Sequence, residues 1–190
     1  MLKKLVKYFV AIAIALFLTP AVFAETEPSA KELEQEVARN MALLQHDADN
    51  AKYLNDLGFA YYRLHRVPEA LTVYMKAVAL DPGSSITRNN LGAAYMRLKE
   101  YGKAEEEFSK ALAIDPSFIK AAYNLSVSLY RQKKYLAAYK AYQKAKKIDA
   151  AYVKKRFNDS HARNELHENL KRDPDNETLQ KMVKGADGEK

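Results

Sequence analysis

The chain has 190 residues, of which 48% are apolar, and it carries a formal net charge of +7. This apolar content is enough to bury a sizeable core, and the six Gly and six Pro residues are few, which favours helices over a turn-rich β fold. The absence of Cys excludes disulfides, thiolate metal sites, cysteine nucleophiles and lipoprotein anchors.

Residues 1–24 have the pattern of a secretory signal peptide. Three Lys residues among the first seven precede an apolar run over 8–18, and small side chains lead up to Ala24. The pattern predicts cleavage after Ala24 and export, which in a bacterium means the periplasm. The alternative is an uncleaved N-terminal segment that anchors the chain in the membrane, although the run is shorter than the about 20 residues of a spanning helix.

Residues 25–50 are predicted to form a linker and an N-terminal capping helix. Ser29 and Glu32 have the spacing of a capping box. An apolar stripe then predicts a helix over about 30–46, formed by Leu33, Val37, Met41 and Leu44. The segment has a net charge of −5.

A pattern with a period of 34 residues follows over 51–152. In each unit, apolar residues at offsets of three and four predict two amphipathic helices. A small residue in the first helix recurs as Gly58, Gly92 and Ser126, and aromatic residues in the second helix recur as Tyr74, Phe108 and Tyr142. A larger side chain at such a small position would overpack the helix contact, at a cost of roughly 1–3 kcal/mol.

This pattern resembles the tetratricopeptide repeat (TPR) family over about half of the chain. The resemblance implies an all-α fold, a right-handed TPR solenoid of three helical hairpins with extra capping helices at both ends. The three TPR repeats would cover 51–84, 85–118 and 119–152.

Two departures from the family pattern carry structural expectations. Arg88 stands where the family prefers a large apolar residue, which predicts a loosely packed first turn of its helix. Ala150 stands where the first two units have Pro, which predicts that the second helix of the third unit continues toward Phe157.

Beyond the repeats, residues 153–183 are predicted to form C-terminal capping helices. One begins at Asp159 or Ser160, and the apolar residues of the two helices are Ala162, Leu166, Leu170, Leu179, Met182 and Val183. Residues 184–190 have nothing to bury and are predicted to form a disordered tail.

No motif predicts catalytic residues, a cofactor or a metal site, so the chain is not expected to be an enzyme. The four His residues lack metal-site spacing, the Gly residues are isolated, and no Ser has the setting of a nucleophile. The acidic run 105–107 is predicted to be solvated charge on a helix exterior. Repeats that act as the scaffold part of a catalytic complex are an alternative.

The basic segment 131–156 has a net charge of +9. Solubility is the simplest interpretation. The sharper interpretations are attraction to an anionic membrane surface, to an acidic partner, or to the acidic end of a second copy, which would make a homo-oligomer and a self-associating structural scaffold at the cell envelope. A nucleic acid partner is not expected, because the signal peptide directs the chain away from it.

In the TPR family the first helix of each pair lines a concave groove that binds another protein. The matching positions are predicted to bind a partner here, namely Asn55, Phe59, Tyr62, Arg63, Asn89, Met96, Arg97, Lys120, Tyr123, Tyr130 and Arg131. Aromatic rings and Met offer apolar contact, Asn can hydrogen-bond a peptide backbone, and one Arg per repeat forms a basic row. A protein or peptide ligand with apolar anchors and acidic groups would suit this groove.

Two of these residues, Tyr130 and Arg97, are expected to lie outside the packing set, so that replacing them changes binding and not stability. The family also includes domains that clamp the carboxylate tail of chaperones. Only Asn90 and Lys120 match that clamp, so it is not expected here. The sequence therefore predicts an exported adaptor or assembly factor that binds a protein partner in its groove.

Overall fold

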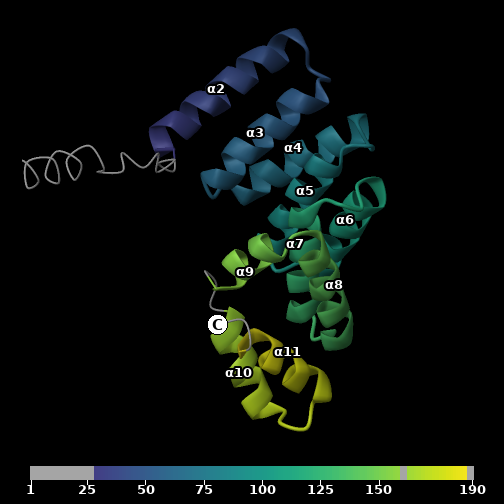
Figure 1. Ribbon diagram of the computed structural model, residues 1–190. Helices are drawn as coiled ribbons and strands as arrows, with labels where there is room; N and C mark the ends of the chain where they lie inside the picture. Colours follow the sequence, from purple (N-terminus) through teal and green to yellow (C-terminus); the bar gives the residue numbers. More distant parts are fainter. Residues whose placement is uncertain (1–27, 159–161, 188–190) are drawn as a thin grey trace, which may run out of the picture. The chain divides into compact units, whose positions relative to one another are not determined.

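The computed structural model describes residues 28–158 and 162–187, and these residues form helices and no strand (Figure 1). The chain forms two compact units, Met1–Glu32 and Leu33–Lys190. Within the described ranges, no helix is long and apolar enough to cross a membrane. The signal peptide predicted over 1–24 lies outside the described residues.

The described part of the first unit contains the start of α2, Ala30–His46. The Glu32 carboxylate accepts a hydrogen bond from the Ser29 backbone N–H at 2.7 Å, and the Glu32 N–H donates to the Ser29 Oγ at 3.3 Å. Hydrogen bonds from the Ser29 side chain and backbone lower the pKa of Glu32. The predicted capping box is therefore present, and α2 covers the residues over which a helix was expected.

In the second unit, three helix pairs follow one another along the chain (Figure 1). They are α3 (Ala51–Arg63) with α4 (Val67–Leu80), α5 (Ser85–Arg97) with α6 (Tyr101–Ile114), and α7 (Ile119–Arg131) with α8 (Tyr135–Ile148). The tight link inside each pair places a non-glycine residue at positive φ, with His65 at 62°, Lys99 at 60° and Lys133 at 61°. The next N–H then bonds back into the first helix, as Arg66 does to the Tyr61 carbonyl at 2.9 Å, which is a Schellman ending.

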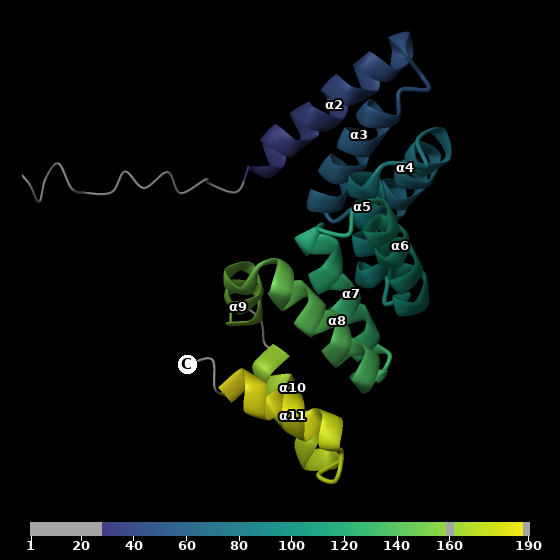
Figure 2. The same cartoon turned by 45° about the vertical axis from the view of Figure 1, so that its right-hand side comes forward.

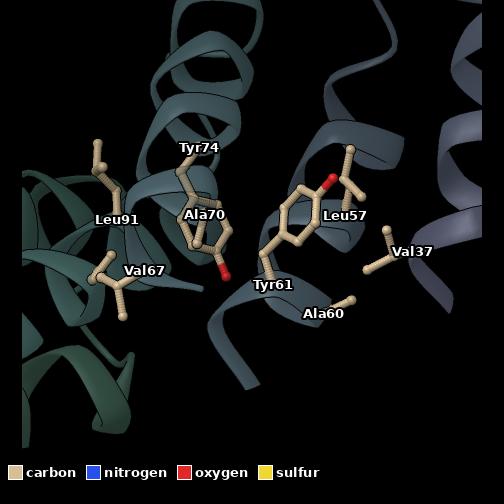
Figure 3. Packing of buried hydrophobic residues seen from close by; sticks show 9 residues of the cluster. Val37, Leu57, Ala60, Tyr61, Val67, Ala70, Tyr74 and Leu91 are labelled. Atoms are coloured by element: carbon tan, nitrogen blue, oxygen red, sulfur yellow. The ribbon is translucent and has the colours of Figure 1, made fainter. Parts of the chain in front are cut away.

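Close helix contact inside the first two pairs depends on glycine. A Cβ built on Gly58 would lie 2.7 Å from the Tyr74 ring, and one on Gly92 would lie 2.7 Å from the Phe108 ring. Figure 3 shows Tyr74 and Ala70 of α4 beside the apolar side chains of α3, with Val37 of α2 beyond them. The small residues that recur with the repeat therefore leave room for a fully buried ring.

The hydroxyl of Tyr74 is a polar atom left in this core. It is buried and has no hydrogen-bond partner among the described residues, and its burial raises the pKa of Tyr74. The second repeat has Phe108 at the same place. We expect Tyr74→Phe to stabilise the fold by about 1 kcal/mol, because an unpaired buried hydroxyl is costly. Denaturant unfolding measures this, and a loss of stability would mean that the hydroxyl has a partner.

Arg88 is not loosely packed, contrary to the sequence expectation. Its guanidinium pairs with the Glu107 carboxylate at 2.9 Å, and its Nε donates to the Pro82 carbonyl at 2.9 Å. The two charged side chains are only 13% and 11% exposed, so Glu107 is also not the solvated charge that was predicted. The long Arg side chain fills the space of the expected apolar residue because a buried acid on α6 receives its charge.

The chain does not continue one helix from the third repeat toward Phe157. Helix α8 ends at Ile148, Asp149 has an extended backbone, and a separate helix α9 (Ala150–Asn158) begins after it. The Asp149 carboxylate accepts a hydrogen bond from the Tyr152 N–H at 2.8 Å. Asp149 thus caps α9. Because a capping residue has a non-helical backbone, α8 and α9 cannot be one continuous helix, and the absence of Pro at position 150 was not enough to predict this.

Two more helices complete the described chain, α10 (Ala162–Arg172) and α11 (Glu177–Asp187), which pack together as a hairpin (Figure 2). Leu166 and Leu179 are buried between them. Helix α11 ends at Asp187, so residues 184–187 of the expected tail are helical, and residues 188–190 lie outside the described residues. The structure is thus an all-α repeat fold with additional helices at both ends.

Candidate binding groove

The first helices of the three pairs, α3, α5 and α7, lie side by side in the second unit. Asparagine side chains connect them. The Asn90 amide donates to the Asn55 Oδ1 at 3.0 Å, and the Asn124 amide donates to the Asn89 Oδ1 at 3.2 Å. Each bond joins one repeat to the next, at a separation of 35 residues.

These bonds change the role predicted for Asn55 and Asn89. The Asn55 amide also donates to Asp56 at 3.3 Å, and Asn89 is only 6% exposed. These bonds occupy part of the hydrogen-bonding capacity of each amide, and burial keeps Asn89 away from a peptide backbone. Their main effect is to fix the register of neighbouring repeats, and the sequence signal for it was the recurrence of Asn one repeat plus one residue apart.

Four predicted residues of the first two repeats form a cluster of two ring–arginine pairs, in which Phe59 and Arg97 are exposed and Tyr62 and Arg63 are half-buried. Phe59 is 45% exposed, with the Arg63 guanidinium 5.9 Å from the centre of its ring. The Arg97 guanidinium lies 4.2 Å from the centre of the Tyr62 ring, which is the distance of a cation–π contact. Met96 lies beside Arg97 in the sequence and is partly buried.

A histidine that sequence reasoning missed helps to hold Arg97. The His65 Nδ1 lies 2.7 Å from the Arg97 Nη1, and the Tyr62 carbonyl accepts from the same nitrogen at 3.5 Å. These contacts hold the Arg97 guanidinium over the Tyr62 ring, while Arg97 remains an exposed residue. His65 lies at positive φ in the link between α3 and α4, which no sequence motif indicates, and its ring nitrogen lies beside Arg97 of the next repeat.

The third repeat differs, because the C-terminal helices of the chain cover its part of the predicted surface. Tyr152 of α9 packs edge-on against Tyr123, with 6.2 Å between the ring centres, and Tyr123 is buried. The Asn169 amide of α10 donates to the Tyr130 hydroxyl at 2.5 Å. Arg131 pairs with Glu165 of α10 at 2.5 Å. Lys120, at the start of α7, remains exposed.

Tyr130 consequently belongs to a core, which corrects the expectation that it lies outside the packing set. Its ring is tilted against Tyr135 at 5.5 Å between ring centres, and it packs on the buried Leu166 and Leu179. Burial raises the pKa of Tyr130, the hydrogen bond from Asn169 opposes this, and the Glu165 carboxylate adds to the rise. A pocket between these helices has Tyr123, Tyr130, Arg131, Glu165, Leu166 and Met182 among its lining residues.

The eleven predicted residues therefore fall into two groups. One group consists of the residues of α3 and α5 together with the exposed Lys120 of α7. The other consists of Tyr123, Tyr130 and Arg131 of α7, which contact the C-terminal helices of the same chain. In the described ranges, no group of three His, Asp or Glu residues could hold a metal ion. Partner binding by these residues stays a prediction.

Comparison with known proteins identifies the repeats. The tetratricopeptide repeat family matches this chain twice, over residues 51–84 and 85–118. No curated protein sequence matches the chain.

Solved structures with the same fold include several TPR domains. The first TPR domain of Spaghetti (RPAP3) bound to the HSP90 peptide SRMEEVD is 27% identical, with a TM-score of 0.52, over 53% of this chain and 80% of that one. The Sgt2 TPR domain from Aspergillus fumigatus is 26% identical, with a TM-score of 0.51, over 53% and 67% of the two chains. MamA is 21% identical, with a TM-score of 0.66, over 80% and 85%, which shows a shared fold.

The two family matches fall on consecutive helix pairs, and the third pair repeats their spacing and the positive-φ link inside each pair. The neighbouring structures share this arrangement. The chain is a tetratricopeptide repeat protein.

Proposed function

We propose that this protein is a non-enzymatic adaptor or assembly factor that holds a protein or peptide partner on the first helices of its repeats. The observation that carries the proposal is the cluster of Phe59, Tyr62, Arg63 and Arg97. Phe59 is 45% exposed, so this large ring is not needed for the core. Exposed aromatic and Arg side chains are the types that dominate protein interfaces.

The chemistry of the partner follows from the side chains of this cluster. Rings accept apolar anchors, and the arginines can pair with carboxylates. The chain gives an internal example on its third repeat, where α10 sets Glu165 on Arg131 and Asn169 on Tyr130. A partner helix or peptide with an acidic residue beside an apolar one would engage the first two repeats in the same way.

The RPAP3 domain supports a peptide partner, because it was solved with an acidic peptide that also contains Met and Val. Its chemistry agrees with the ligand expected here. A chaperone-tail clamp is not proposed, because Asn55, Phe59 and Asn124 stand where that clamp has other residues, and two of these amides bond to neighbouring repeats.

Paired variants test the surface. The mature chain would first be used to capture a partner from an extract, and the identified partner would then be titrated. Phe59→Ala should weaken binding by more than about 1 kcal/mol if Phe59 is an anchor. Arg97→Glu should weaken it most at low salt, where exposed charges are least screened.

Leu80→Ala is the matched control for Phe59→Ala, since Leu80 is 41% exposed and lies on the second helix of the same repeat. Equal affinities of the wild type, Phe59→Ala and Arg97→Glu would place the binding surface elsewhere. Sedimentation of the same sample tests the alternative of a self-associating scaffold. A chain that stays monomeric at low salt would exclude this alternative. Turnover in an activity screen would favour the catalytic alternative.

Export to a bacterial periplasm is part of the proposal and is supported only by the sequence of residues 1–24. We expect an exported chain that begins at Glu25, because the small residues before it form a cleavage site. Intact-mass measurement decides between this and the alternative of an uncleaved membrane anchor, which would still contain Met1.

A further inference from the structure

The outer side of α8 differs from the outer sides of the equivalent helices in the first two repeats. At four corresponding positions α8 has Leu136, Lys140, Lys144 and Lys147, whereas α6 has Gly102, Glu106, Lys110 and Ala113, and α4 has Pro68, Thr72, Lys76 and Ala79. The four α8 residues are all exposed, and their spacing of three and four places them along one helix face. We call these four residues the α8 basic face.

Lys144 lacks, among the described residues, the acidic partner that the lysines at its two equivalent positions have. In α6, Lys110 pairs with Glu106 at 2.6 Å, and in α4, Lys76 pairs with Asp49 at 3.0 Å. Lys140 replaces the acid of the α6 pair, so an attractive pair one helical turn apart becomes a repulsive pair with Lys144. Like charges at this spacing destabilise a helix. No carboxylate of the described residues pairs with Lys140, Lys144 or Lys147.

An exposed apolar side chain stands at one end of the face. Leu136 is 58% exposed, and a surface hollow lined by Lys134, Tyr135, Leu136, Ala137 and Lys140 surrounds it. Helix α9 follows with Lys154 and Lys155, both exposed. Unlike Lys134, which pairs with Glu105 at 2.8 Å, these lysines have no ion pair within the described part of the chain.

We propose that the α8 basic face docks on an anionic membrane surface. Lysines along one helix side match a plane of anionic headgroups, and a neighbouring exposed Leu can enter the boundary of the acyl chains, which is how interfacial helices bind. A soluble polyanion would use the lysines and leave Leu136 without a role. The lysines of the α8 basic face are without an acidic partner among the described residues, whereas Lys110 of α6 and Lys76 of α4 have one. This difference agrees with an anionic partner outside the chain. This docking does not depend on the binding proposed for α3 and α5.

Vesicle binding tests the proposal. The measurement uses residues 25–190, because the apolar run before Ala24 would itself bind lipid. This length contains all described helices. Co-sedimentation would use vesicles of phosphatidylcholine alone and of phosphatidylcholine with phosphatidylglycerol in equal parts. We expect binding to the anionic vesicles only. Replacing Lys140, Lys144 and Lys147 together by Gln should weaken it on the order of a hundredfold, and Leu136→Ser about tenfold.

The matched control replaces Lys31, Lys99 and Lys184 by Gln, which changes net charge equally at exposed sites off the α8 basic face. It should bind nearly as the wild type does. Equal losses in the two triple variants would show that net charge alone attracts the chain, and equal binding to uncharged vesicles would show that lipid charge is irrelevant. Either result would overturn the proposal.

Two further readouts separate membrane docking from attraction to a soluble polyanion and from unfolding. If heparin binds the chain and Leu136→Ser leaves vesicle binding unchanged, the face attracts a soluble polyanion and the membrane is the wrong partner. Thermal unfolding of the α8 triple variant should show an unchanged or raised Tm, because like charges are removed from the helix. A lowered Tm would attribute the weaker binding to unfolding and contradict a docking role.

Discussion

Gly92→Ala is expected to destabilise the protein by about 2 kcal/mol. Its new Cβ would lie 2.7 Å from Cε1 and 2.9 Å from Cδ1 of Phe108. The Phe108 ring is fully buried and cannot move into solvent, so the helices must separate or the ring must leave its rotamer. The gain of about 1 kcal/mol in helix propensity that Ala brings offsets only part of this strain. Chemical denaturation of the purified chain measures the difference.

Gly102→Ala is the matched control, since a Cβ at Gly102 meets nothing within 4 Å. It should leave stability unchanged or raise it slightly through helix propensity. A Gly92→Ala protein as stable as the Gly102→Ala protein would mean that α5 and α6 tolerate a wider separation. The third repeat lacks this arrangement, because Ser126 stands at the glycine position and Tyr142, which occupies the position of Phe108, is only partly buried.

Tyr130→Ala is expected to lower stability by about 2 kcal/mol and to release α10 and α11. The change removes a half-buried ring from the cluster with Leu166 and Leu179, together with the hydrogen bond from Asn169. Because these interactions are all made with the C-terminal helices, amide hydrogen exchange should accelerate in α10 and α11 and stay slow in α3 to α6.

Tyr130→Phe separates the two contributions, since it keeps the ring and removes only the acceptor of the Asn169 bond. A decrease of about 1 kcal/mol in stability is expected, opposite in sign to the effect of Tyr74→Phe. If exchange in α10 and α11 is the same in Tyr130→Ala and the wild type, Tyr130 does not hold these helices, and its role as an exposed anchor for a partner would return.

The repeat architecture was predictable because its signals are local. Helix pairs, their period and the close approach of the two helices at small residues follow from residue type and spacing alone. The structure adds that Gly58 and Gly92 lie against the rings of Tyr74 and Phe108. The capping box at Ser29 was predictable for the same reason. Such features need only one helix or one pair of helices to be read.

The candidate site was less predictable because it depends on which segments meet. Nothing in the spacing indicated that Glu165 and Asn169 would cover Arg131 and Tyr130, since these contacts bridge more than 30 residues across different helices. The burial of Arg88 with Glu107 is another such case. From the sequence alone, each of these polar side chains could be exposed to solvent or buried in a helix contact. The partner residue on another helix determines which of the two occurs.

The contact of α10 with the third repeat means that any separate ligand of this repeat must compete with a segment of the same chain. Because α10 belongs to the same chain, it competes for Arg131 and Tyr130 at an effective concentration on the order of millimolar. A separate helix present at micromolar concentration must bind these two residues roughly a thousandfold more tightly than α10 does to occupy half of the molecules. Under the proposed function, weak ligands would therefore bind only to the first two repeats, and α10 would set the affinity that a ligand needs to bind the third.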